Sequence, residues 1–223
     1  MTTPYEALGA IATQQVAIGP RLEHFELYTL GGLLSMVWHW PDSPAGDDPA
    51  GVVICGGGAM GGMLGPADGL YHHLGTTLAA DHGIALVRVS WRQPNELDEC
   101  TLDALAALQL AARRGAPKAV MVGHSFGGAV AVRAGVAADE LVAGVVTLAT
   151  QSAGCEVADG LAGRPVLCIH GTADELLPVA CSEVVAGLAG GELVVLPGAG
   201  HLLRPHGAEL HDRLVTWIVD VLA

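Results

Sequence analysis

Six short runs of apolar, mainly β-branched residues lie between residues 51 and 198 and indicate the fold class. Helix-like segments at 71–81, 97–114, 127–138 and 179–189 separate most of these runs, and another follows at 207–222. Nearly continuous apolar runs are typical of strands covered on both faces, as in parallel sheets with right-handed crossovers. The pattern therefore predicts an α/β fold. The runs are GVVIC, IALVRVSW, KAVMVG, LVAGVVTLA, RPVLCIHG and ELVVLPG.

Two earlier stretches, 21–29 and 33–41, flank Gly31-Gly32, and this arrangement predicts an antiparallel hairpin. With the six runs it gives a mainly parallel sheet of about eight strands with helices on both faces. Residues 1–20 are interpreted as a weakly amphipathic N-terminal extension, and residues 43–51 as a turn-rich loop. Nothing in the 223 residues marks a domain boundary, so we expect a single domain over residues 1–223.

The segment 97–114 has the clearest helical pattern of the sequence. A stripe of five residues at helical spacing predicts a face that packs into the core. Three carboxylates lie on or near the first turn, where negative charge favours the helix dipole. The stripe consists of Leu97, Thr101, Leu105, Leu108 and Ala112, and the carboxylates are Asp98, Glu99 and Asp103.

Composition and charge exclude several classes of protein. Hydrophobic residues make up 51% of the chain, yet no apolar run reaches the roughly 20 residues that cross a bilayer. A net charge of −13 disfavours nucleic acids and anionic membranes as partners. We therefore expect a soluble protein without either partner, and a homo-oligomer is left open. The absence of basic residues before Arg21 argues against a secretory signal and predicts a cytoplasmic location.

The five cysteines have irregular spacing. This distribution predicts buried, reduced thiols and indicates neither a disulfide framework nor a CxxC metal site. The sequence also lacks HExxH or another metal-ligand spacing. We expect neither a metal nor another cofactor.

Ser125 lies in the stretch VMVGHSFGGAV, between an expected strand and an expected helix. In a chain with 31 glycines a G-x-S-x-G pattern arises easily by chance, so the strand-turn-helix context carries the interpretation. Gly123 and Gly127 leave room for the sharp turn on which a nucleophilic serine can be held. Ser125 is therefore the candidate nucleophile.

A serine hydroxyl needs a base, and the base needs an acidic group that orients it. Asp174 and His201 follow two later strands, in the stretches VLCIHGTADELLP and LVVLPGAGHLL. The alternative for Asp174 is a turn or helix-capping residue, with Glu175 as a competing carboxylate. His124 and His170 are interpreted as residues that shape the site. The order serine, aspartate, histidine is the one expected for a hydrolase built on this type of sheet.

An oxyanion formed by nucleophilic attack needs hydrogen-bond donors. One candidate is the backbone N–H of Phe126, and the other is that of Gly57, with Gly58 as the alternative, in the loop CGGGAMGGMLG. Several side chains in expected strand-end loops are candidates for an apolar substrate pocket, and ordinary packing is the alternative for each. They are Met60, Trp91, Gln151, Leu176 and Leu202, together with Met63, Leu64 and Phe126.

The stretches GGGAMGG, GHSFGGAV, HGTADELLP and PGAGHLL occur in this order, and through them the chain resembles the α/β-hydrolase superfamily from about Leu22 onward. It is most similar to small members of the dienelactone-hydrolase-like branch. The resemblance implies an α/β-hydrolase fold and an acyl-enzyme mechanism with Ser125, Asp174 and His201 as the triad. Only SAGCEVADGLA stands where relatives insert a lid, so no cap domain is expected.

The chain departs from this family at two points. Cys55-Gly56 replaces the His-Gly that starts the oxyanion loop of many relatives, and a serine replaces the cysteine nucleophile of dienelactone hydrolases proper. The expected function is cleavage of a carboxylic ester, thioester or related acyl bond of a small molecule.

Two alternatives to this function stay open. The same fold can serve acyl transfer, non-hydrolytic chemistry or binding. More remotely, Gly56, Gly58 and Gly61 fit the G-x-G-x-x-G pattern of a dinucleotide-binding module, although the next apolar run ends in Ser90-Trp91-Arg92 and not in an acidic residue.

Overall fold

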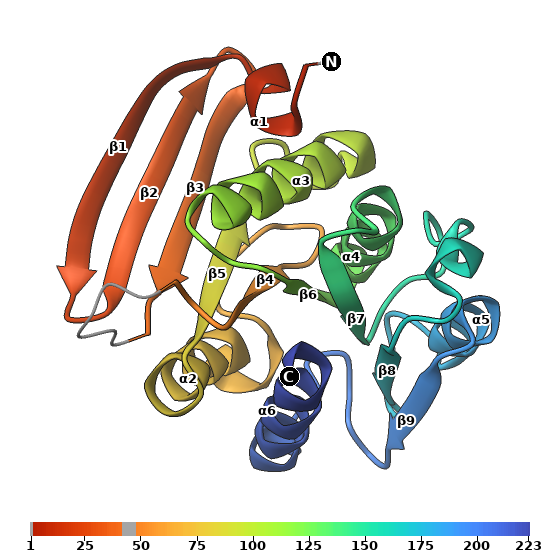
Figure 1. Cartoon of the computed structure of the whole chain (residues 1–223). Helices are drawn as coiled ribbons and strands as arrows, with labels where there is room; N and C mark the ends of the chain where they lie inside the picture. Colours follow the sequence, from red (N-terminus) through yellow and green to blue (C-terminus); the bar gives the residue numbers. More distant parts are fainter. Residues whose placement is uncertain (1, 42–47) are drawn as a thin grey trace.

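The computed structural model describes residues 2–41 and 48–223, so residues 43–47 of the predicted turn-rich loop lie outside the described residues. The described chain forms a nine-stranded sheet in the order β1-β2-β3-β5-β4-β6-β7-β8-β9 (Figure 1). The first three strands and the β3–β5 contact are antiparallel, and all other neighbours are parallel. The strands are β1 (Ala10–Gly19), β2 (Leu22–Thr29), β3 (Gly32–His39), β4 (Gly51–Gly56), β5 (Ile84–Ser90), β6 (Ala119–His124), β7 (Val142–Leu148), β8 (Val166–Gly171) and β9 (Glu192–Leu196).

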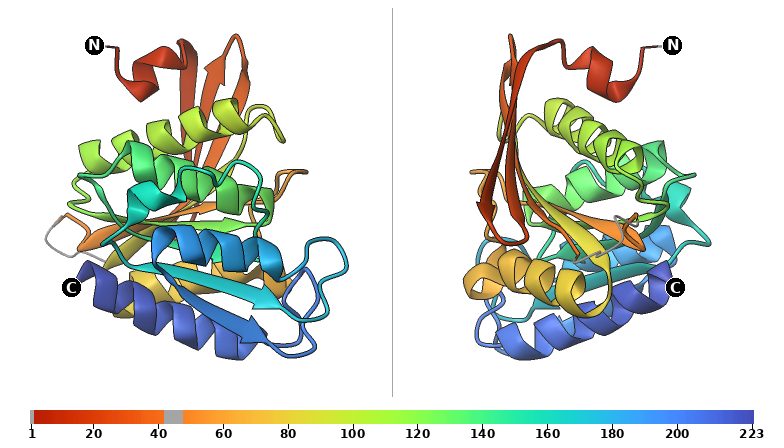
Figure 2. Two further views of the ribbon diagram at one scale, coloured as in Figure 1. Left: turned by 90° about the vertical axis from the view of Figure 1, so that its right-hand side faces the viewer. Right: turned by 60° about the vertical axis from the view of Figure 1, so that its left-hand side comes forward.

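Helices cover the parallel part of the sheet on both faces (Figures 1 and 2). Two apolar clusters result, one between the sheet and α3, α4 and α5, the other between the sheet and α2 and α6. Strands β4 and β6 lie at the centre and are buried along their whole length. The helices are α1 (Pro4–Ala7), α2 (Pro66–Asp81), α3 (Leu97–Arg113), α4 (Phe126–Ala137), α5 (Ala180–Ala189) and α6 (Gly207–Leu222), with a short 3₁₀ helix at Ala158–Leu161.

The predicted fold class is confirmed, with a mainly parallel sheet, an antiparallel hairpin near the N-terminus and helices on both faces. The sheet has nine strands where about eight were expected, because the segment interpreted as an extension contains β1. Its sequence AIATQQVAIG has Gln14-Gln15 in the middle, which weakens the alternation that would indicate a strand. Pairing with β2 supplies the backbone hydrogen bonds that this local pattern does not reveal.

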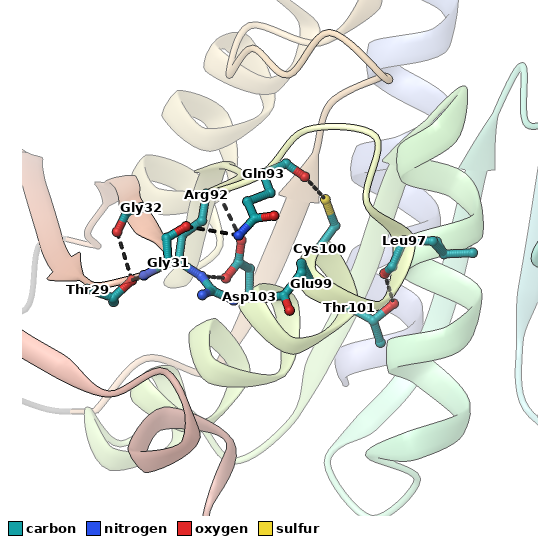
Figure 3. Close-up of polar contacts among 10 residues, drawn as sticks. All are labelled: Thr29, Gly31, Gly32, Arg92, Gln93, Leu97, Glu99, Cys100, Thr101 and Asp103. Atoms are coloured by element: carbon teal, nitrogen blue, oxygen red, sulfur yellow. Dashed lines mark hydrogen bonds and ion pairs between the residues drawn. The ribbon is translucent and has the colours of Figure 1, made fainter.

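A buried ion pair fixes the loop between β5 and α3 (Figure 3). Asp103 is fully buried on α3, and its carboxylate accepts hydrogen bonds from the backbone N–H and the Nε of Arg92. Arg92 Nη2 also lies 2.7 Å from Glu99 Oε2, and Gln93 Nε2 donates to Gly31 O of the β2–β3 turn at 3.1 Å. Because neither buried charge is left unpaired, the pair is strongly held. The backbone directly after Trp91 is thereby anchored to α3.

No cap domain interrupts the sheet. Every residue between β7 and β8 is described, and the only regular element there is the four-residue 3₁₀ helix. The carboxyl ends of the central strands are therefore covered only by loops. None of the helices in the described part of the chain combines the length and the apolar character that a membrane span requires.

The five cysteines are free thiols, as predicted, and all but Cys181 are buried. Cys55 lies on β4 and Cys168 on β8, inside the central sheet. Burial raises the pKa of Cys55 and of Cys168 above the usual value. These sulfurs stay protonated and act as packing groups.

Candidate active site

Ser125 occupies the turn between β6 and α4 with a backbone φ of 57° and ψ of −121°. A residue with a Cβ rarely adopts this conformation. The Ser125 N–H donates to Leu148 O at 2.8 Å, and the Ser125 carbonyl accepts from the Gly128 N–H at 2.9 Å. Backbone hydrogen bonds on both sides thus hold the strained residue at the carboxyl end of the central strands, and its side chain is half-buried.

The glycines around Ser125 are required by close backbone contacts. A Cβ on Gly123 would lie 1.9 Å from Gly127 O, and one on Gly127 would lie 2.4 Å from Gly57 O. A Cβ on Gly128 would lie 2.2 Å from Thr150 Oγ1. Only glycine lets α4 approach β6 and the loop after β4 this closely. The G-x-S-x-G pattern therefore has a structural cause at Ser125 and is not a chance product of composition.

Asp174 and His201 form a short hydrogen bond, with Asp174 Oδ2 2.7 Å from His201 Nδ1. The other carboxylate oxygen of Asp174 accepts from the backbone N–H groups of Leu176 and Leu177, each at 2.9 Å. Burial opposes ionisation of Asp174, but the hydrogen bonds from Leu177, His201 and Leu176 outweigh it and hold the pKa of this carboxyl below its usual value. Asp174 is thus an ionised, fixed acceptor for the His201 ring.

His170, fully buried on β8, is a second imidazole on the same carboxylate. Its Nε2 lies 3.2 Å from Asp174 Oδ2 and 3.0 Å from Leu177 O, and its Nδ1 lies 2.7 Å from Ser182 Oγ. Both groups facing Nε2 are acceptors, so Nε2 carries the proton and Nδ1 accepts from the serine hydroxyl. His170 therefore contacts Asp174 from the buried strand β8, a position that suits the expected role of a residue that shapes the site.

His124, directly before Ser125, supports the His201 loop. Its Nε2 donates to His201 O at 2.9 Å, and the two imidazole rings lie 4.9 Å apart. Burial lowers the pKa of His124 from 6.5 to about 4, so the ring is neutral near pH 7. A neutral ring can pack against His201 without repelling a charge that forms there.

Ser125 and His201 open into one cleft of about 460 Å³. They make no hydrogen bond with each other in this structure, and such contacts often tighten only when substrate binds. The structure therefore brings the three predicted residues to one rim of the sheet, with the Asp174–His201 contact formed. The cleft is lined by Ser125, His201, His124, Leu176 and Leu202 and by residues 57–65 of the glycine-rich loop.

The glycine-rich loop after β4 places Gly58 next to Ser125, where a Cβ on Gly58 would lie 3.6 Å from Ser125 Cβ. The Gly61 N–H donates to Gly58 O at 2.9 Å and closes a tight turn. Gly57 also lines the cleft, and its carbonyl accepts from Trp91 Nε1 at 3.4 Å. Phe126 is the first residue of α4, where helix geometry leaves the N–H without an acceptor in the helix. Gly57 and Gly58 thus line the cleft that contains Ser125, and Phe126 directly follows Ser125 in the chain.

The predicted pocket residues separate into two groups. Met60, Leu176 and Leu202 line the cleft, as do Met63 and Leu64. The cleft is not lined by Trp91, Gln151 or the Phe126 ring. Trp91 and Phe126 are each only 3% exposed and belong to the core, and Gln151 Nε2 donates to Ala153 O at 2.8 Å.

Trp91 and Thr150 have positions that the sequence did not indicate. The Trp91 ring packs directly against Gly56, where a Cβ would lie 2.4 Å from the ring. Thr150 Oγ1 lies 3.3 Å from Ser125 O and 3.0 Å from Gln151 O, so its single proton is shared between these two carbonyls. Each follows a strand of the sheet, at its carboxyl end. That shared position is the only sequence signal that could have identified them as supports of the site.

The dinucleotide-binding alternative finds no support in this geometry. Gly56 is the last residue of β4, and Gly58 and Gly61 close a tight turn, whereas the fingerprint needs its glycines at the start of a helix. Helix α2 begins only at Pro66, and Ala67, Asp68 and Gly69 still have positive φ angles. No group of three or more histidine, cysteine, aspartate or glutamate side chains in residues 2–41 and 48–223 is arranged to hold a metal ion.

No protein-family model matches the sequence, and a search of curated proteins finds no match. Solved structures do match. Est1E from Butyrivibrio proteoclasticus superimposes with a TM-score of 0.74 at 17% identity, over 89% of this chain and 98% of that chain. A dienelactone hydrolase from Anabaena variabilis gives 0.73 at 17% identity, over 93% and 98%.

A third similar structure is an α/β serine hydrolase without a lid from Xanthomonas campestris. Its TM-score is 0.69 at 18% identity, over 91% of this chain and 96% of that chain. A structural similarity at such low sequence identity is evidence for the fold only. Together with the strand order and the strained serine turn, it establishes that the chain has the α/β-hydrolase fold, without a cap.

Proposed function

We propose that the protein is a serine hydrolase that cleaves a carboxylic ester, a thioester or a related acyl bond through an acyl-enzyme. The observation that carries this proposal is the convergence of Ser125 and His201 on one cleft, with His201 held by the buried Asp174. The similar structures support it, since two of them are an α/β serine hydrolase and a dienelactone hydrolase.

The hydrogen bond to Asp174 determines which nitrogen of His201 can act as the base. An ionised carboxylate only accepts, so His201 Nδ1 carries a proton, and Nε2 of the neutral ring has a free lone pair. Nε2 takes the proton of Ser125 as the hydroxyl oxygen attacks the substrate carbonyl, and then gives it to the leaving group. Water, activated by the same nitrogen, finally hydrolyses the acyl-enzyme.

The oxyanion that forms on attack would be bound by backbone N–H groups. The first is that of Phe126, at the N-terminus of α4, where the helix dipole also favours negative charge. The second comes from the glycine-rich loop, from Gly57 or Gly58. Trp91 supports this loop from below through the hydrogen bond to Gly57 O, so the donors are held in place before substrate arrives.

The cleft suggests a small or medium-sized acyl group. Its volume of about 460 Å³ is at the lower end of ordinary ligand pockets, and no cap closes it. Met60 is 95% exposed and Leu176 is 73% exposed, so the apolar rim is open to solvent. Est1E has been solved with ferulic acid bound, and an ester of an aromatic acid therefore belongs among the substrates to be tested.

The test is the hydrolysis of p-nitrophenyl esters of graded chain length, of a ferulate ester and of thioesters. Ser125→Ala is expected to lower kcat/KM by at least about 10³-fold, because the acyl-enzyme cannot form. Ser152→Ala is the matched control, since Ser152 lies outside the cleft, and it should retain full activity. Equal activity of wild type and Ser125→Ala would overturn the proposal.

Acyl transfer is distinguished from hydrolysis by the products. In aqueous buffer the free acid should accumulate in step with p-nitrophenol. A protein that releases p-nitrophenol only in a single burst, and turns over when an alcohol or amine is added, would be an acyltransferase on the same residues. Absence of any covalent chemistry at Ser125 would instead indicate a binding protein with this fold.

A further inference from the structure

Strand β1 is the free edge of the sheet, and it is unusually open (Figures 1 and 2). Nine of its ten residues are exposed, so neither of its faces is covered by a helix. The exposed residues include Ile11 at 65%, Val16 at 46% and Ile18 at 53%. At a rise of about 3.3 Å per residue, the edge is about 33 Å long.

Edge strands normally carry devices that prevent pairing with another chain, such as charges, prolines or shortness. β1 contains no ionisable residue and no proline. The opposite edge, β9, has only five residues and begins with Glu192. β1 is therefore an uncharged, extended template of unpaired backbone groups, in a chain whose net charge is −13.

We propose that β1 pairs antiparallel with β1 of a second copy of this chain, so that one sheet continues across a two-fold axis. The net charge of −13 disfavours contact between two copies in general, whereas β1 itself carries no charge that would repel its own copy. A symmetric dimer needs a surface that is complementary to itself, and an uncharged strand edge provides one.

The side chains on the regular part of β1 match this symmetry. Ala12, Gln14 and Val16 lie on one face, beside Tyr28, Glu26 and His24 of β2. Gln15 is engaged with Glu23 and Arg114, whereas the Gln14 side chain makes no hydrogen bond with any described residue. With Gln14 on the axis, the two Gln14 amides can donate to and accept from each other. Ala12 then lies opposite Val16 of the second copy, on both sides of the axis.

The proposed interface is independent of the proposed function. The cleft lies at the carboxyl ends of the central strands, and β1 contributes no residue to it. Loss of the dimer should therefore leave hydrolysis unchanged, and loss of Ser125 should leave the dimer unchanged.

Sedimentation velocity on the full chain, from about 1 to 100 μM, tests the proposal. Wild type should be a dimer in the upper part of this range. Gln14→Lys combined with Val16→Lys should raise the dimer Kd at least about tenfold, because the lysine at position 14 faces its own copy across the axis and the lysine at position 16 adds a charge opposite Ala12. The matched control combines Val184→Lys with Leu188→Lys on α5, where both residues are similarly exposed, and it should dimerise like wild type.

Cross-linking is a second test that does not depend on the lysine variant folding. Where two β1 strands pair antiparallel, a residue on the two-fold axis lies opposite the same residue of the second copy, with about 4.5–5.5 Å between the two Cα atoms. A disulfide can span this distance. Gln14→Cys should thus form a covalent dimer on oxidation, whereas Val184→Cys should not. A wild type that stays monomeric at 100 μM, a lysine variant that dimerises like wild type, or equal cross-linking of the two cysteine variants would each overturn the proposal.

Discussion

Replacing Ser125 by glycine should stabilise the protein relative to Ser125→Ala while both changes abolish activity. With φ at 57° and ψ at −121°, any residue with a Cβ is strained here, at a cost of about 1–3 kcal/mol. Glycine relieves this strain but loses about 0.5–1 kcal/mol more entropy on folding. The net gain over alanine is then about 0–2.5 kcal/mol, because alanine also lacks the hydroxyl but keeps the Cβ. For a chain of 223 residues this corresponds to a Tm increase of up to roughly 10 °C.

The measurement is urea unfolding of the two variants, monitored by tryptophan fluorescence, with Tm from differential scanning calorimetry. Ser152 serves as the control position, because its φ is not positive and Ser152→Gly should be less stable than Ser152→Ala by about 0.5–1 kcal/mol. If Ser125→Gly were less stable than Ser125→Ala, the turn would not store strain, and the account of how Ser125 is held would be wrong.

Three further predictions follow from the packing and the buried polar groups. Gly123→Ala should destabilise the fold by about 3 kcal/mol or more, because the added Cβ would lie 1.9 Å from Gly127 O. Gly187→Ala on α5 should instead stabilise the fold by about 1 kcal/mol, because no atom lies near its added Cβ. Chemical unfolding measures both free energies. Burial lowers the pKa of His39 to about 3 and that of His124 to about 4. The contribution of each neutral imidazole to the free energy of unfolding is therefore fully present above about pH 6.5, and it decreases by about 3 kcal/mol per imidazole as the pH falls toward 4. Unfolding of His39→Phe across this pH range should show a shallower decline in stability, and an equal slope would contradict the assignment. His170→Phe should lower kcat about ten- to a hundredfold with little change in KM, because Asp174 loses the imidazole N–H that lies 3.2 Å from its Oδ2 and helps to orient it, and unchanged kcat in the ester assay would show that His170 only fills space.

Much of the fold followed from the sequence because the central strands are buried on both faces. Such strands need long apolar runs, and these are visible without any structure. β1 was missed as a strand because it is exposed on both faces and needs no apolar pattern. Asp103 was interpreted as one of three carboxylates on or near the first turn that favour the helix dipole, and the structure buries it against Arg92, a partner eleven residues away. Ion pairs of this kind depend on how helices and strands pack together, and the local sequence pattern does not specify that packing.

The site was predictable where residues belong to short motifs and less so where it depends on side-chain direction. Ser125, Asp174 and His201 each follow a strand, and parallel strands bring such positions to one edge of the sheet. The pocket residues were chosen by the same rule, yet the rule does not say which way a side chain points. Trp91 therefore lies beneath the glycine-rich loop, whereas Leu176 lines the cleft.

The most direct test of the central claim is covalent labelling with a fluorophosphonate probe, followed by peptide mass spectrometry. Activation of Ser125 by His201, which Asp174 orients, predicts a single adduct on Ser125, absent in Ser125→Ala and formed much more slowly in His201→Ala. An adduct on another residue, or equally fast labelling of wild type and His201→Ala, would contradict the claim that Ser125 is a nucleophile activated by His201.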